Sequence, residues 1–109
     1  MKSTEINLTL EQIRAAQAEI AREMDDAQLS PAGQRSLEKA SLHLRNLERL
    51  LVDAIEATLI LDLKKETSAL KGLVDEMNKT AEELFKITGI LGKVVSITGQ
   101  LIDVLTKLV

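Results

Sequence analysis

The C-terminal half of the chain carries a pattern that is typical of a long helix. From Leu63 to Val109, apolar residues and threonines recur without interruption at alternating steps of four and three. Such steps place side chains on one face of an α-helix, whereas a half-buried strand requires a step of two. The pattern predicts a helical region with a coiled-coil-like heptad seam. The seam consists of Leu63, Thr67, Leu70, Val74, Met77, Ala81, Leu84, Thr88, Leu91, Val95, Thr98, Ile102, Leu105 and Val109.

A strand is the alternative for residues 93–105, because this segment is rich in β-branched side chains. Strict period-two alternation is missing, and the heptad order continues through the segment from Leu63. Helix is therefore favoured over strand. Glycine is a poor helix former, so a kink or break in this helix is expected between Gly89 and Gly92.

The N-terminal half predicts two further helices. Thr9 and Gln12 form a capping-box pattern that predicts a first helix over about 10–28. Ser30 is a good N-cap and Pro31 suits the first helical position, so a second helix begins at Pro31. Its seam consists of Leu37, Ala40, Leu44, Leu47, Leu51, Ala54, Thr58 and Leu61.

The seam changes phase near Asp62 to Ser68, which marks either a reversal of chain direction or a stutter in one long helix. A reversal is favoured, because one helix over 31–109 far exceeds the usual length of a globular element. The expected fold is all-α: an antiparallel bundle of three to four helices, or a long helical hairpin, forming a single domain over 1–109. The expected helices span about 10–28, 31–61, 63–88 and 90–108, and the last two are continuous if Gly89 and Gly92 do not break them.

Composition removes several classes of function. With 14 Lys and Arg against 17 Asp and Glu, the net charge of -3 disfavours general binding to nucleic acid. Phe85 is the only aromatic residue, so the chain cannot build a base-stacking platform. The absence of cysteine removes disulfides and thiolate chemistry. The N-terminal residues lack the apolar segment of a signal peptide, which favours a cytoplasmic location.

His43 is the only side chain with an ordinary pKa near neutrality. On a helix its neighbours at i−4 and i+3 are Lys39 and Asn46, and neither is a carboxylate that would orient the imidazole. A histidine at the surface or the core boundary is therefore the favoured interpretation. We accordingly predict no catalytic residue, no cofactor-binding residue and no metal ligand, and we expect the protein not to be an enzyme.

Residues 84–109 differ from an ordinary surface helix, because they are apolar or small around most of the helix. A line of lysines at seven-residue spacing includes Lys86, Lys93 and Lys107. Beside the apolar seam lies a second line whose central members are Gly89, Gly92, Ser96 and Gly99, here called the small-residue line. Small residues at this spacing permit close approach of another helix. The predicted helix-packing residues are Leu84, Gly89, Leu91, Gly92, Val95, Ser96, Gly99, Ile102 and Leu105.

A helix that is apolar on most sides must be buried on more than one side. We therefore expect a non-enzymatic helical interaction module that is a homo-oligomer, with a dimer favoured, or that binds a helical protein partner. The alternative is a membrane-active protein, either pore-forming or peripheral, that uses the helix over 84–109, with Lys86, Lys93 and Lys107 facing lipid head groups. A constitutive transmembrane helix is disfavoured, because Lys93 and Asp103 would each cost about 2.5–3.5 kcal/mol near the centre of a bilayer.

Overall fold

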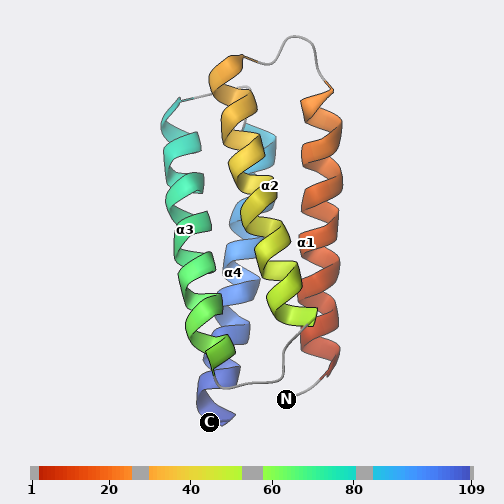
Figure 1. Cartoon of the computed structure of the whole chain (residues 1–109), viewed down its shortest axis with the longest axis vertical. Coiled ribbons are helices and arrows are strands. Elements are labelled where there is room, and N and C mark those ends of the chain that lie inside the picture. The colour runs from red at the N-terminus through yellow and green to blue at the C-terminus, as the bar shows by residue number, and fades with distance from the viewer. Residues whose placement is uncertain (1–2, 26–29, 53–57, 81–84, 109) are drawn as a thin grey trace.

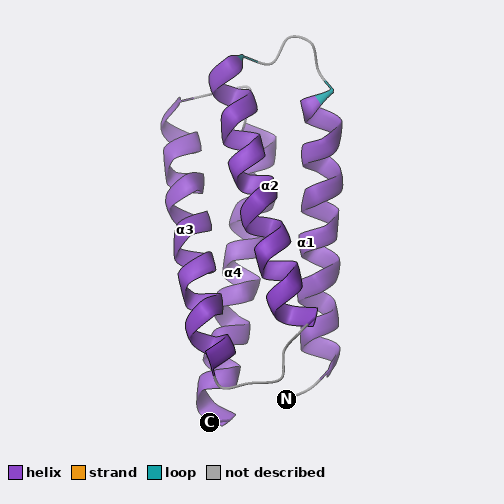
Figure 2. Cartoon of the chain, in the orientation of Figure 1, coloured by secondary structure: helices purple, strands orange, loops and turns teal. Residues whose placement is uncertain are grey.

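The computed structural model describes residues 3–25, 30–52, 58–80 and 85–108, and each of these segments is helical over nearly its whole length. The described segments contain no strand, as Figure 2 shows. The all-α prediction is therefore confirmed, and helix rather than strand forms over residues 93–105. The four helices are α1 (Ser3–Met24), α2 (Pro31–Val52), α3 (Thr58–Thr80) and α4 (Phe85–Leu108).

The helices lie side by side and alternate in direction, so that both termini lie at the same end (Figure 1). Each helix packs against two others: α2 lies against α1 and α3, and α4 lies against α3 and α1. The fold is thus an antiparallel four-helix bundle closed by the contact between the first and last helices. This closure gives α4 two neighbours within its own chain.

The core consists of leucine, isoleucine, valine, methionine and alanine side chains from all four helices. In α2 the predicted seam is confirmed, because Leu37, Ala40, Leu44 and Leu47 are all fully buried. Each fully buried side chain of leucine size contributes about 1.5–3 kcal/mol relative to an exposed one. In α4, residues outside the predicted seam are buried as well as residues within it. The buried apolar residues of this helix include Ile87, Leu91, Val94, Leu101, Ile102 and Leu105.

Two threonines on α4 bond to the backbone of their own helix. The hydroxyl of Thr98, which is fully buried, donates a 2.8 Å hydrogen bond to the carbonyl oxygen of Val94. Thr106 donates in the same way to the carbonyl of Ile102 at 2.7 Å. A buried hydroxyl is costly only if it lacks a partner. Thr98 can therefore take the place of an apolar residue in the heptad seam.

The start of α2 forms as predicted. Ser30 precedes the helix, and its hydroxyl oxygen accepts a 3.1 Å hydrogen bond from the backbone N–H of Gly33. The Ser30 carbonyl accepts a second bond from the N–H of Gln34 at 2.9 Å. Pro31 occupies the first helical position, where its missing N–H costs nothing.

Removing this cap should destabilise the protein measurably. A Ser30→Ala variant is expected to lower the free energy of unfolding by about 1 kcal/mol, because the N–H of Gly33 loses its acceptor. Chemical denaturation followed by circular dichroism measures the change. The matched control is Ser68→Ala, an exposed position inside α3 where alanine is the better helix former. Equal destabilisation by both substitutions would contradict the capping role.

The first helix begins earlier than predicted. We expected Thr9 to cap a helix starting at Leu10, but α1 starts at Ser3 and Thr9 lies inside it. The Thr9 hydroxyl donates to the backbone carbonyl of Glu5 at 2.9 Å instead of accepting from a backbone N–H. The helix ends at Met24, and the remainder of the predicted span, residues 26–28, lies outside the described residues.

The reversal between the second and third helices is real, but its predicted position is wrong. The second helix ends at Val52 and the third begins at Thr58, so Asp62 to Ser68, where we placed the turn, lies inside α3. Leu61, which the α2 seam predicted to be buried, is 60% exposed. Ala54 falls outside the described residues. The phase change therefore marks where the α3 seam begins rather than where the chain turns.

The boundary between the last two helices is also displaced. We expected it near Gly89, with continuity as the alternative, but α3 ends at Thr80 and α4 begins at Phe85. The two helices run in opposite directions, so a continuous helix over 63–108 is excluded (Figure 1). Gly89 and Gly92 lie inside α4 without ending it. Burial of the helix against two neighbours outweighs the low helix propensity of glycine.

Candidate functional site

The predicted packing residues of α4 divide between two faces of the helix. Leu91, Ile102 and Leu105 are buried in the core of the bundle, and Val95 is half-buried. The small-residue line lies farther out: Gly92 and Gly99 are half-buried, whereas Gly89 and Ser96 are exposed. Leu84 lies outside the described residues. The structure therefore brings the apolar packing residues together in the core and leaves the small-residue line nearer the outside of the bundle.

The small-residue line does not serve close packing within the chain. A Cβ atom added to Gly89, Gly92 or Gly99 would meet no neighbouring atom within 4 Å. All three glycines have ordinary helical backbone angles, so none is required by a left-handed conformation. Within the bundle, these glycines are neither a packing requirement nor a turn requirement, and the surface beside them is open.

The three lysines predicted to face lipid differ in their surroundings. Lys93 and Lys107 are exposed on α4. Lys86 is also exposed, but its Nζ lies 3.1 Å from a carboxylate oxygen of Glu19 on α1. The other oxygen of Glu19 lies 2.7 Å from a guanidinium nitrogen of Arg22. Glu19 thus connects the start of α4 to the end of α1, and Lys86 is a structural cation in the bundle.

The carboxyl of Glu19 has a pKa below its ordinary value of 4.5. The hydrogen bond from Lys86 is the largest cause, and the positive charges of Arg22 and Lys86 act in the same direction. Burial of the Glu19 side chain opposes them by disfavouring the charged form. The net effect stabilises the ionised carboxylate in the folded protein.

This shift predicts a dependence of stability on pH. Because the folded-state pKa is lowered, the contribution of Glu19 is complete above its unfolded pKa and disappears as the pH falls through the folded value. The difference in unfolding free energy between the natural chain and Glu19→Gln should be largest near neutrality and vanish in acid. Denaturant titrations at several pH values measure it. Glu11→Gln, which removes an exposed carboxylate from the same helix, serves as the control. A difference that grows toward acid would contradict the assignment.

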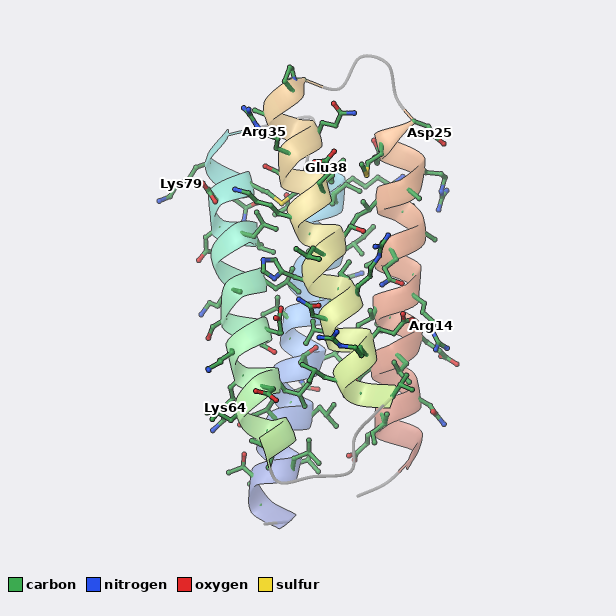
Figure 3. The ribbon with its side chains drawn as sticks, viewed as in Figure 1. Arg14, Asp25, Arg35, Glu38, Lys64 and Lys79 are labelled. Carbon is green, nitrogen blue, oxygen red and sulfur yellow. The ribbon has the colours of Figure 1, made fainter. Side chains whose placement is uncertain are left out.

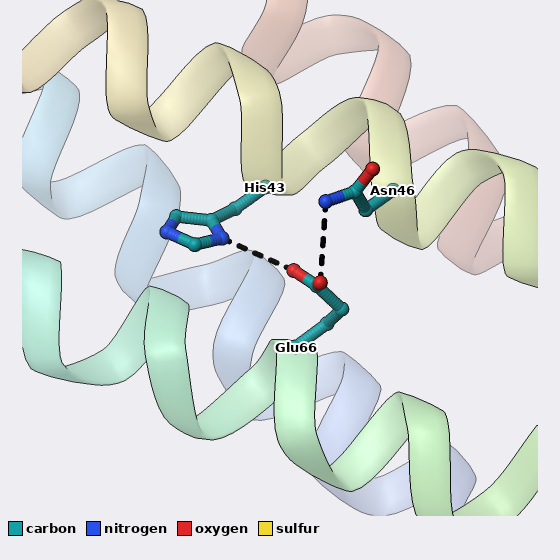
Figure 4. Close-up of polar contacts among 3 residues, drawn as sticks. All are labelled: His43, Asn46 and Glu66. Atoms are coloured by element: carbon teal, nitrogen blue, oxygen red, sulfur yellow. Dashed lines mark hydrogen bonds and ion pairs between the residues drawn. The ribbon is translucent and has the colours of Figure 1, made fainter.

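A second polar cluster joins α2 to α3, and sequence analysis missed its key member. His43 Nδ1 lies 3.1 Å from one carboxylate oxygen of Glu66, and the side-chain N–H of Asn46 donates to the other oxygen at 3.2 Å. Figure 4 shows His43 and Asn46 reaching from α2 toward Glu66 on α3. Lys39 and Asn46, the helical neighbours of His43, are not carboxylates, and the carboxylate partner of His43 comes instead from α3. No local sequence pattern indicates this contact, because Glu66 lies 23 positions from His43 in the sequence.

The chemistry available to this cluster is limited. A carboxylate at Nδ1 fixes the orientation of an imidazole, as in many catalytic and metal sites. Both oxygens of Glu66 are occupied by the two groups from α2, and the pair is about three-quarters buried. Within the described ranges, no three His, Cys, Asp or Glu residues gather in a way that could hold a metal ion. The arrangement suits a contact that fixes the register of α2 against α3.

Many of the exposed residues outside these clusters carry charged side chains. Lys64 and Lys79 of α3 extend away from the helices (Figure 3). Among the described residues, the large apolar side chains that are exposed are Leu8, Leu42, Val52 and Leu61. One stretch of α4, Lys86–Lys107, is long and apolar enough to cross a membrane by length and composition alone.

No family model, no curated protein and no solved structure matches this chain.

Proposed function

We propose that this protein is a non-enzymatic helical interaction module that associates with a second copy of itself through the small-residue line of α4. The main observation in support of this proposal is that Gly89, Gly92 and Gly99 have open space where a Cβ atom would lie. Each glycine costs a helix about 0.8–1.0 kcal/mol relative to alanine. The bundle gains no close contact in return, whereas a second helix could approach the bare backbone closely.

The charges beside the small-residue line favour a second copy of this chain in an antiparallel arrangement. If two α4 helices pair about Ser96, Asp103 of one copy lies at the height of Gly89 in the other. It is then within about one helical turn of Lys86 and Lys93 of that copy. Such pairing is isologous, so the attraction between Asp103 and the two lysines occurs twice in the dimer.

Within one chain, the heptad spacing of the buried residues in α3 and α4 supports coiled-coil-type packing between these two helices.

Sedimentation equilibrium over a range of concentrations tests this proposal. The natural chain should form a dimer, and Gly92→Leu should weaken the dimer at least about tenfold, because a large side chain separates the two backbones. The matched control is Gly72→Leu on α3, an exposed glycine that, like Gly92, has nothing within 4 Å of its Cβ position. It should leave association unchanged. A natural chain that stays monomeric at the highest concentration, or equal effects of both substitutions, would overturn the proposal.

A second candidate function is binding to anionic membranes, and the apolar character of α4 favours it. The bundle buries only 39% of the stretch that could span a membrane. Lys93 and Lys107 on the exposed side provide charges that attract anionic head groups.

Flotation with vesicles of anionic phosphatidylserine or of neutral phosphatidylcholine alone tests membrane binding. Binding should require the anionic lipid and weaken in Lys93→Gln with Lys107→Gln. It should persist in the control Lys64→Gln with Lys79→Gln, which removes two exposed lysines from α3. No flotation, or equal loss in both double variants, would eliminate this candidate.

A further inference from the structure

An open hollow lined mainly by arginines lies between α1 and the C-terminal part of α2. Its volume is about 420 Å³, and its lining consists of Arg14, Arg45, Glu48, Arg49 and Val52. Arg14 belongs to α1, and the other four residues belong to α2. Three arginines against one glutamate give the lining a net charge of +2. The hollow therefore attracts anions, although the chain as a whole is acidic.

Glu48, the acidic residue of the lining, is already bonded. Nε of Arg14 donates a 2.8 Å hydrogen bond to Oε2 of Glu48, and this contact joins α1 to α2. Arg45 and Arg49 are exposed and form no ion pair with another residue that the structure describes. A guanidinium carries N–H donors and no acceptor. The donors of Arg45 and Arg49 are therefore available to an anion that enters the hollow from solvent.

The spacing of Arg45 and Arg49 also favours an anion between them. The two residues stand at i and i+4 on α2, so they are neighbours on one face of the helix. Like charges at this spacing destabilise a helix. Arg49 lies in the last turn, where a cation interacts favourably with the helix dipole, but Arg45 lies before that turn. A bound anion replaces the repulsion between the two arginines by attraction to a shared partner.

We propose that this hollow binds a phosphate monoester whose organic part is apolar. The phosphate carries a charge of about −1.5 to −2 near neutrality, which matches the net charge of the lining. Guanidinium groups donate paired hydrogen bonds to phosphate oxygens, so Arg45 and Arg49 hold the phosphate. The organic part lies against Val52, which is 60% exposed at the same hollow. The proposal is independent of the small-residue line, which lies on α4.

Other anions suit the hollow less well. A carboxylate carries a single negative charge and leaves part of the positive charge of the lining unmatched. Inorganic phosphate leaves Val52 in water, and the hollow has the volume of a small-molecule site, which is about 300–1,000 Å³. A nucleic acid requires an extended basic surface, whereas this chain has a net charge of -3. The phosphate monoester can be a free aryl or alkyl phosphate or a phosphorylated tyrosine side chain.

NMR of the full chain in phosphate-free buffer at about pH 7.5 and constant ionic strength tests the proposal, with phenyl phosphate as the probe. The probe should shift the Nε–H signals of Arg45 and Arg49 and the methyl signals of Val52, with millimolar affinity. Benzoate, which has the same ring and a single charge, should bind at least about fivefold more weakly. Nα-acetyl-phosphotyrosine amide distinguishes the sources: comparable or tighter binding assigns a phosphorylated side chain, and binding of phenyl phosphate alone assigns a free ester.

A pair of double variants makes the test specific. Arg45→Gln with Arg49→Gln should weaken phenyl phosphate binding at least about tenfold and leave the protein folded, because both side chains are exposed. The matched control is Arg35→Gln with Lys39→Gln, which removes two exposed cations at the same spacing from the other end of α2 (Figure 3). It should leave the affinity unchanged. Absence of shifts with phenyl phosphate, equal binding of benzoate, or equal weakening by both double variants would overturn the proposal.

Discussion

A Leu91→Ala variant is expected to lower the free energy of unfolding by about 2–5 kcal/mol. Leu91 lies within α4 and is fully buried among side chains of the bundle core. Truncation removes apolar burial and leaves a cavity that the neighbouring helices fill only in part. The total stability of a domain of this size is about 5–15 kcal/mol, so the loss should be evident in both thermal and denaturant unfolding.

The control for this experiment is Leu42→Ala in α2. Leu42 is 58% exposed, so the same change of side chain should alter stability by no more than about 0.5 kcal/mol. The contrast between the two leucines tests whether α4 is part of the core. A small effect at Leu91, comparable to that at Leu42, would mean that α4 is not docked on its own bundle.

Replacing Gly89, Gly92 and Gly99 together by alanine is expected to raise the free energy of unfolding by about 2–3 kcal/mol. All three lie in α4, and an added methyl group at each meets nothing within 4 Å. Alanine restricts the unfolded chain and favours the helix without a steric penalty. The measurement is denaturant unfolding at a concentration low enough for the protein to be monomeric.

The same triple variant separates stability from association. If a second copy packs on the small-residue line, the more stable monomer should dimerise less well, because three methyl groups hold the helices apart. Gly72→Ala in α3 should stabilise the protein by about 1 kcal/mol and leave dimerisation unchanged. A triple variant that is less stable than the natural monomer would show that the glycines are packed within the bundle.

The sequence predicts the elements that depend on local chemistry. The start of α2 follows from Ser30 and Pro31, which act within a single helical turn. The buried side of α2 follows from the spacing of Leu37, Leu44 and Leu51. Helix rather than strand over residues 93–105 follows from the heptad order. In each case the determining residues are close together in sequence.

The positions of the turns were harder to predict because apolar residues continue through them. Leu61 fits the α2 seam by spacing, yet it belongs to α3 and is exposed. No glycine or proline marks the segment between Val52 and Thr58. Spacing alone therefore placed the reversal too late. Likewise, glycine suggested a break at Gly89, where tertiary packing supports an uninterrupted helix.

The polar contacts between helices could not be predicted, because they depend on how one helix is placed against another. His43 and Glu66 meet only when α2 and α3 take their observed register. The ion pair of Glu19 and Lys86 requires the closure of α1 against α4. A single sequence specifies which face of a helix is apolar, but not which polar residues on two helices share the same height.

Native-state amide hydrogen exchange in α4 tests the central claim most directly, namely that this helix is sheltered by its own chain. The amides of Leu91, Val94 and Thr98 should exchange as slowly as those of Leu44 and Leu47 in α2, because all of them require global unfolding. Their protection should be the same at every protein concentration that gives a monomer. Fast exchange confined to α4, or protection that appears only as the concentration rises, would contradict the account.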